Sequence, residues 1–177
     1  METPSQLDGE LAKHNCKALL KVVKARELSH LAVRDWKKRV DKILKVGALL
    51  SSTATTYAVS SQNENIDETT LLIERILSFT TTIFTGLTAM YNNEKKADLH
   101  DKSGNEYAKL ANMIDVKIQS DCCTIEDFHH FSHLYREMRE SATALSEWVK
   151  KKHPEACKNP SELQDWTPRV GIRTTSL

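Results

Sequence analysis

Residues 46–63 read VGALLSSTATTYAVSSQN, residues 76–93 read ILSFTTTIFTGLTAMYNN, and neither stretch contains a charged residue. Charged residues make up 28% of the 177-residue chain, so two uncharged windows of 18 residues each depart from its average composition. About 20 mostly apolar residues span a bilayer as a helix, and roughly 18 without charge is the usual lower limit. The pair therefore predicts a transmembrane helical hairpin over residues 46–93.

The high content of Ser and Thr in both windows leaves a second interpretation open. Hydroxyl groups can donate hydrogen bonds to the carbonyls of the preceding turn, which lowers their cost in lipid without removing it. The soluble alternative is a buried helical hairpin within a four-helix bundle. In either case, 5 Gly, 4 Pro and 6% aromatic residues are too few for a β-sandwich or barrel, and we expect an all-α fold.

The charges around the two windows are sorted by sign. The loop between them, residues 64–74, is acidic and contains no Lys or Arg, whereas basic residues crowd against the first window and return after the second at Lys95 and Lys96. The positive-inside rule places both termini in the cytosol and the acidic loop on the other side. A soluble bundle has no reason for this sorting, so the charges favour an integral membrane protein. The preceding basic residues are Lys37, Lys38, Arg39, Lys42 and Lys45.

Small residues recur every fourth position in both windows. Such spacing lets helix backbones approach closely and lets hydroxyls bond across the contact. We therefore expect the hairpin to pack, and copies of the chain to associate, through these positions, above all the two glycines. They are Gly47, Ser51 and Thr55 in the first window and Ser78, Thr82 and Gly86 in the second.

Outside the hairpin, hydrophobic periodicity predicts three more helices. Residues 1–45 form a basic amphipathic helix, most regular over 7–42, whose apolar stripe includes Trp36 and Ile43. Residues 94–152 form a cytosolic helical pair, the second helix running from Thr124, a cap with Asp127, to about Lys151 before Pro154. Residues 153–177 form an extended tail.

Two heptad-like stripes run through this pair and predict an antiparallel contact or a contact between copies. Together with the tail, helices 7–42 and 124–152 are the expected docking surfaces for other proteins. The stripes are Ala97, His100, Gly104, Tyr107, Ala111, Ile114 and Ile118, then Phe128, Phe131, Tyr135, Met138, Ala142, Leu145 and Val149.

The chain contains no catalytic constellation: a P-loop, a dinucleotide fingerprint, G-x-S-x-G and H-E-x-x-H are all missing from the sequence. Cys122, Cys123, His129 and His133 are candidates for a zinc site, but no C-x2-C pair supports them, and free thiols with surface histidines are the favoured interpretation. His100 falls on the buried stripe, where a hydrogen-bonded core histidine is commoner than a general base. We expect no enzyme activity, no cofactor and, given a net charge of +1, no specific nucleic acid partner.

The run Ala97-x2-His100-x6-Tyr107-x2-Leu110-x3-Ile114 follows the second window. With the basic helix and the two Ser/Thr-tolerant windows, it resembles the SLATT proteins (SMODS and SLOG-associating two-transmembrane effectors). The resemblance implies a non-enzymatic module that oligomerises and perturbs or perforates membranes. A membrane-anchored structural component, such as a minor capsid protein of a large DNA virus facing the capsid side of an inner membrane, is the alternative. A soluble helical adaptor is the second.

Overall fold

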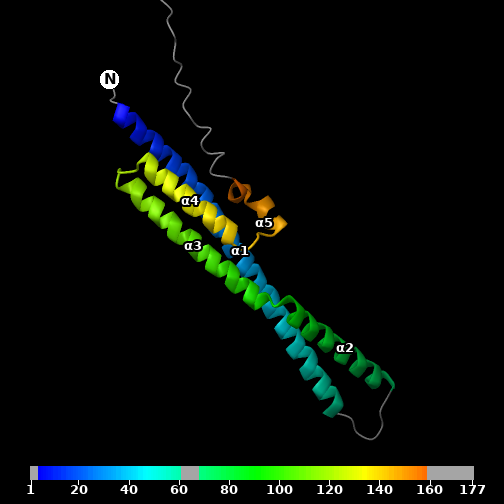
Figure 1. Ribbon diagram of the computed structural model, residues 1–177. Coiled ribbons are helices and arrows are strands. Elements are labelled where there is room, and N and C mark those ends of the chain that lie inside the picture. The colour runs from blue at the N-terminus through cyan, green and yellow to red at the C-terminus, as the bar shows by residue number, and fades with distance from the viewer. Residues whose placement is uncertain (1–3, 61–67, 159–177) are drawn as a thin grey trace, which may run out of the picture. The chain divides into compact units, whose positions relative to one another are not determined.

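A computed structural model describes residues 4–60 and 68–158, and every element within these ranges is helical. The prediction of an all-α chain is confirmed for them. The elements are α1 (Pro4–Ser60), α2 (Glu68–Tyr91), α3 (Asn93–Gln119), α4 (Ile125–Ser141), α5 (Glu147–Lys152) and the 3-10 helix η1 (Pro154–Cys157) (Figure 1). They divide into two compact units: residues 1–32 with 100–177 form unit 1, and residues 33–99 form unit 2.

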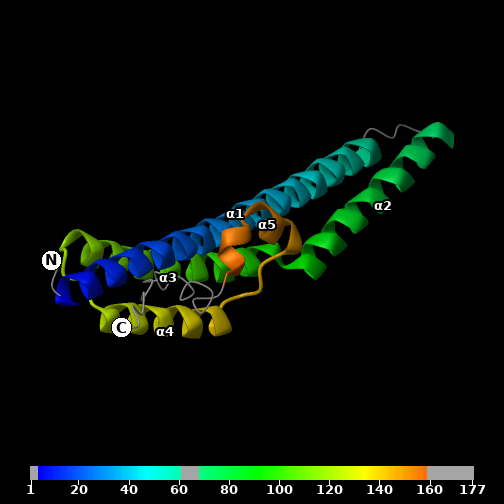
Figure 2. The same cartoon turned by 90° about the horizontal axis from the view of Figure 1, so that it is seen from above.

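Unit 1 is built on three helical segments that share one hydrophobic core. The N-terminal part of α1, α3 and α4 lie side by side (Figure 2). The predicted stripe of α3 from His100 to Ile118 is buried, and Phe128, Phe131 and Tyr135 of α4 are buried against it. Periodicity alone therefore located the inner faces of α3 and α4.

The turn between α3 and α4 combines a left-handed residue with a helix cap. Asp121 has φ 53, a conformation that Asp tolerates better than most residues, and its carboxylate pairs with Lys13 of α1. Thr124 caps α4 as predicted: its hydroxyl accepts a hydrogen bond from the Asp127 backbone N–H, and the Asp127 carboxylate accepts one from the Thr124 N–H at 3.0 Å. This reciprocal capping box fixes where α4 begins.

The prediction of one helix from Thr124 to Lys151 is wrong, because α4 ends at Ser141. Ala142 is extended, with φ -71 and ψ 148, and Ser146 is again extended before α5 begins. Ser and Thr are weak helix formers in this segment, and the change of direction keeps Leu145 and Val149 buried. The tail is also partly structured, since η1 begins at Pro154; residues 159–177 lie outside the described residues.

The buried stripe of α1 differs from the predicted one. Trp36 and Ile43, which were assigned to the apolar stripe, are 47% and 67% exposed. Within unit 1, the buried positions instead follow Ala12, Cys16, Leu19, Val23, Arg26 and His30. A hydropathy pattern does not reveal this stripe because the stripe includes polar residues. These residues are buried because they have partners inside the unit.

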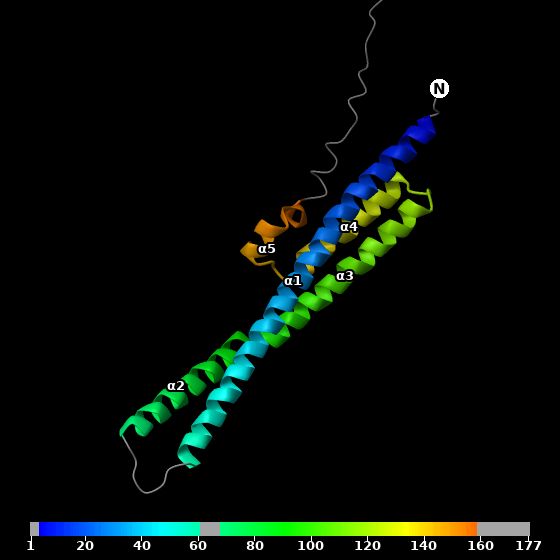
Figure 3. The ribbon, with the colours of Figure 1, turned by 180° about the vertical axis from the view of Figure 1, so that it is seen from behind.

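Unit 2 is a helical hairpin formed by the C-terminal part of α1 and by α2 (Figure 3). Asn92, with φ 39, separates α2 from α3, whose first turns close the base of the hairpin through buried Asn93 and Ala97. Part of the predicted acidic loop is helical, because residues 68–74 belong to α2; residues 61–67 lie outside the described part of the chain.

One helical stretch of the described chain, Leu71–Gln119, is long and apolar enough to cross a membrane, and none of its apolar window is buried. Its apolar part lies in α2, because α3 is rich in charged residues. Helix α1 is long enough, but its uncharged part, residues 46–60, does not reach the same mean hydropathy. Their Ser and Thr residues are the cause.

We expect Thr124→Ala to lower the free energy of unfolding of unit 1 by about 1 kcal/mol, because the change removes the side-chain half of the capping box. Urea unfolding followed by circular dichroism measures it. Thr143→Ala, in the non-helical segment before α5, is the matched control and should change the value by less than about 0.5 kcal/mol. Equal effects of the two substitutions would contradict the role of the cap.

Candidate functional site

The outer surface of unit 2 is apolar along both arms of the hairpin. Phe79 of α2 is 68% exposed and Leu49 of α1 is 66% exposed, values typical of charged surface residues in a water-soluble protein. A contiguous surface of this kind marks contact with a membrane or with another protein. The other large exposed apolar residues of the two arms are Val46, Leu50, Tyr57, Val59, Leu71, Leu72, Ile73, Ile76, Ile83, Met90 and Tyr91.

The hydroxyl groups of the two arms form hydrogen bonds within their own helices. Each Ser or Thr concerned donates to the carbonyl oxygen four residues earlier, as Thr80 does to Ile76 at 2.7 Å and Thr55 does to Ser51 at 2.8 Å. A hydroxyl that is satisfied in this way costs less to place in an apolar medium. The same bond is made by Ser51, Thr53, Thr56, Thr81, Thr82 and Thr88.

The small residues of the first window face the inside of the hairpin, whereas those of the second face outward. A Cβ on Gly47 would lie 3.0 Å from the ring of Phe84, so the missing side chain makes room for that ring. Ser51 is buried and Thr55 is half-buried on the same stripe. Gly86 has nothing within 4 Å of such a Cβ, and Ser78 and Thr82 are exposed. Gly86 therefore does not pack the two arms together. Phe84 is the residue of α2 that contacts Gly47.

In unit 1, two residues of the family-like run, His100 and Tyr107, contact the buried His30. Nδ1 of His100 lies 3.1 Å from Nδ1 of His30, and the His30 ring stacks on Tyr107 with centroids 5.4 Å apart. Leu110 and Ile114 extend the same buried face of α3, while Ala97 is buried in unit 2. His100 is a hydrogen-bonded core histidine, as the sequence predicted.

The environment of the pair keeps His30 neutral. Burial, and then the charges of His100 and Arg26, lower the pKa of His30 to about 3. We assign the shared hydrogen to Nδ1 of His30, because Nε2 of that ring has no hydrogen-bond partner among the described residues. Arg26 is itself buried and donates from Nη1 to the Ala156 carbonyl oxygen at 2.8 Å. This contact holds η1 in place.

The four zinc candidates are not gathered into one site. Cys122 is exposed, and Cys123 is buried with its Sγ 2.8 Å from Sγ of Cys16. His129 is exposed, and His133 faces Glu137 at 3.6 Å. Within residues 4–60 and 68–158, no group of three or more His, Cys, Asp or Glu side chains is placed to hold a metal ion. Burial, followed by the contact with Cys123, raises the pKa of Cys16, which makes it a poor nucleophile.

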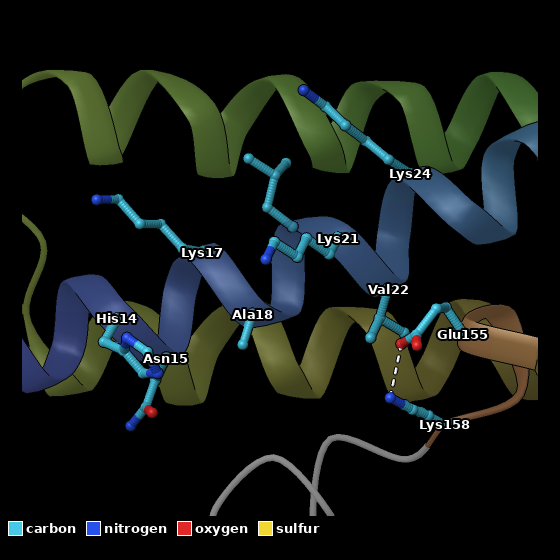
Figure 4. Close-up of a pocket in the computed structure, with 10 residues that line it drawn as sticks. His14, Asn15, Lys17, Ala18, Lys21, Val22, Lys24, Glu155 and Lys158 are labelled. Carbon is cyan, nitrogen blue, oxygen red and sulfur yellow. Dashed lines mark ion pairs between the residues drawn. The ribbon is translucent and has the colours of Figure 1, made fainter. Parts of the chain in front are cut away.

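A groove of about 860 Å³ runs along the α1 segment of unit 1 (Figure 4). Lys17, Lys21 and Lys24 line it from one face of the helix, and a 2.8 Å ion pair between Glu155 and Lys158 closes one end. The three lysines make no ion pair with another described residue. The groove is therefore a one-sided basic surface.

Sequence reasoning missed the inner polar residues of α1, namely Cys16, Arg26, Ser29 and His30. Their spacing follows the helical repeat. A search for helical periodicity that includes polar as well as apolar residues would have found them. Comparisons of the chain with protein-family models, with curated proteins and with solved structures give no match. A functional proposal therefore depends on the geometry of the two units.

We expect unit 1 to lose stability on acidification. An unfolded histidine binds a proton below about pH 6.5, whereas folded His30 does so only near pH 3. Stability is therefore fully present above pH 6.5 and falls as the pH drops toward 3, by up to about 1.4 kcal/mol per pH unit. Urea unfolding at a series of pH values should show a shallower slope for His30→Phe than for the unmodified chain. An equal slope for His30→Phe and the unmodified chain would contradict this account.

Proposed function

We propose that this chain is a non-enzymatic two-pass membrane protein whose hairpin, unit 2, inserts into the bilayer. The observation that carries the proposal is the apolar outer surface of both arms, whose large side chains have no protein interior to enter. The intrahelical hydroxyl bonds support it, since they lower the cost of placing Ser and Thr in lipid. The sorting of charge around the hairpin favours cytosolic termini.

Within this proposal, the chain acts as a SLATT-like effector that oligomerises and perturbs or perforates membranes. The outward face of α2 formed by Ser78, Thr82 and Gly86 supports association between copies, because small residues let helices approach closely in lipid. A membrane-anchored scaffold, such as a minor capsid component, is the alternative. Exposed apolar residues of unit 1, such as Met113 and Val116, support that version as contacts for other proteins.

Carbonate extraction of membranes from expressing cells tests insertion, and we expect the unmodified chain in the pellet. Phe79→Asp with Ile83→Asp should move it to the supernatant, because an aspartate at the centre of a membrane helix costs about 3 kcal/mol. Met113→Asp with Val116→Asp is the matched control: these apolar residues are also exposed, but they lie in unit 1. Recovery of the unmodified chain in the supernatant would favour the soluble helical adaptor and overturn the proposal.

Vesicle leakage separates the effector from the scaffold. We expect the reconstituted chain to release ions from liposomes, and Gly86→Leu to weaken both the release and detergent-resistant oligomers by several-fold. The substitution has room in a single copy, so any loss reports on contacts between copies. Gly9→Leu adds the same side chain at another open position outside the hairpin and is the control. Tight vesicles containing inserted protein would leave the scaffold as the function.

A further inference from the structure

Six basic side chains gather at the base of the hairpin in unit 2, and we call them the basic collar. Lys37 is half-buried, and the other five are exposed. Three nearby carboxylates are already paired: Asp35 with Arg34 at 2.8 Å, and Asp41 and Glu94 with Lys45 at 2.8 and 3.0 Å. Asp98, one helical turn after Lys95, makes no ion pair with a described residue. Within the described residues, no ion pair joins the collar to a carboxylate. The collar consists of Lys37, Lys38, Arg39 and Lys42 of α1 and Lys95 and Lys96 of α3.

The four α1 residues of the collar spread over about 200° of the helix circumference instead of occupying one face. Successive residues of an α-helix are about 100° apart, so Lys37, Lys38 and Arg39 point in three different directions. The lysines of the unit 1 groove, Lys17, Lys21 and Lys24, follow a spacing of four and three and share one face. A protein that binds from one side would contact cations along one face of a helix. A planar lipid layer that the helix crosses would contact cations around its circumference.

Two cations of the collar repel each other. Burial, and then the positive charge of Lys96, lower the pKa of Lys37. Like charges are unfavourable near each other unless an anion lies close to both. A negatively charged group at this position would relieve the repulsion.

Exposed aromatic residues border the collar. The Lys37 Nζ atom lies 5.6 Å from the centroid of the Trp36 ring, and Tyr91, at the end of α2, is 54% exposed. Trp and Tyr concentrate at the level of lipid headgroups, where a ring meets apolar chains on one side and water on the other. The collar thus adjoins the apolar surface of the arms in the arrangement expected at a membrane interface.

We propose that the basic collar binds the negatively charged headgroups of anionic lipids in the cytosolic leaflet. Lysine and arginine N–H groups donate charge-assisted hydrogen bonds to phosphate oxygens, and each cation near an anionic surface favours binding by a factor of about five. This inference rests on the proposed insertion of unit 2 and adds the class of lipid that the inserted protein selects.

The test uses the full chain reconstituted in phosphatidylcholine with a trace of spin-labelled phosphatidylserine or spin-labelled phosphatidylcholine. The motionally restricted part of the electron spin resonance spectrum measures the lipid in contact with the inserted surface. We expect phosphatidylserine to associate at least about twofold more strongly than phosphatidylcholine. The preference should shrink between 0.1 and 1 M salt, where the Debye length falls from about 10 to about 3 Å.

Two triple variants make the comparison specific. Lys38→Gln, Arg39→Gln and Lys42→Gln together should bring the two lipids to equal association. Lys17→Gln, Lys21→Gln and Lys24→Gln remove the same charge from equally exposed, unpaired positions of α1 in unit 1 and should keep the preference. Glutamine preserves helix propensity in both.

Each outcome has one meaning. Equal association of the two lipids with the unmodified chain, or a preference that survives the collar variant, overturns the inference and leaves insertion standing. A preference lost equally in both triple variants also overturns it, since net charge alone would then explain the selection. Absence of any restricted lipid with the unmodified chain would instead remove the proposed insertion, and the inference with it.

Discussion

The apolar side chains of unit 2 have almost no protein interior to enter, and the roles proposed for the rest of the chain depend on this constraint. Two helices can bury only the stripes that face each other, so most of the circumference of each arm points outward. In unit 1, α4 joins α1 and α3, and together the three segments enclose a core around Tyr107 and Tyr135. Among the described residues, unit 2 has no third long helix, so the apolar surface of its two arms stays exposed.

Polar groups are satisfied differently in the two units. In the hairpin, hydroxyls bond to the backbone of their own helix, so the surface presented outward carries few unmet donors. In unit 1, the polar side chains of α1 reach other elements: His30 contacts His100, and Arg26 contacts the carbonyl of Ala156. Hydrogen bonds within one helix leave the surface of the hairpin to its apolar side chains, whereas hydrogen bonds between elements give unit 1 a single arrangement.

Sequence periodicity predicted the helical class, the buried stripes of α3 and α4 and the Thr124 cap, because each depends on residues within a few turns of one another. It failed where a contact in space overrode the local pattern. The inner stripe of α1 contains Arg26 and His30, whose polarity places them outside any hydrophobic stripe until their partners on α3 and η1 are known. The end of α4 at Ser141 was missed because Leu145 and Val149 keep the helical spacing without being in the same helix.

The sequence by itself determined that the chain is helical, that its charges are sorted around two uncharged windows, and that a basic cluster precedes the first of them. These properties belong to composition and spacing, which folding does not alter. Only the tertiary structure decided which side of each arm faces inward. Gly47 packs against Phe84 while Gly86 faces outward, although the two glycines occupy equivalent small-residue patterns. Helical spacing defines a face, but the bulk of the neighbouring side chains selects the face that is buried.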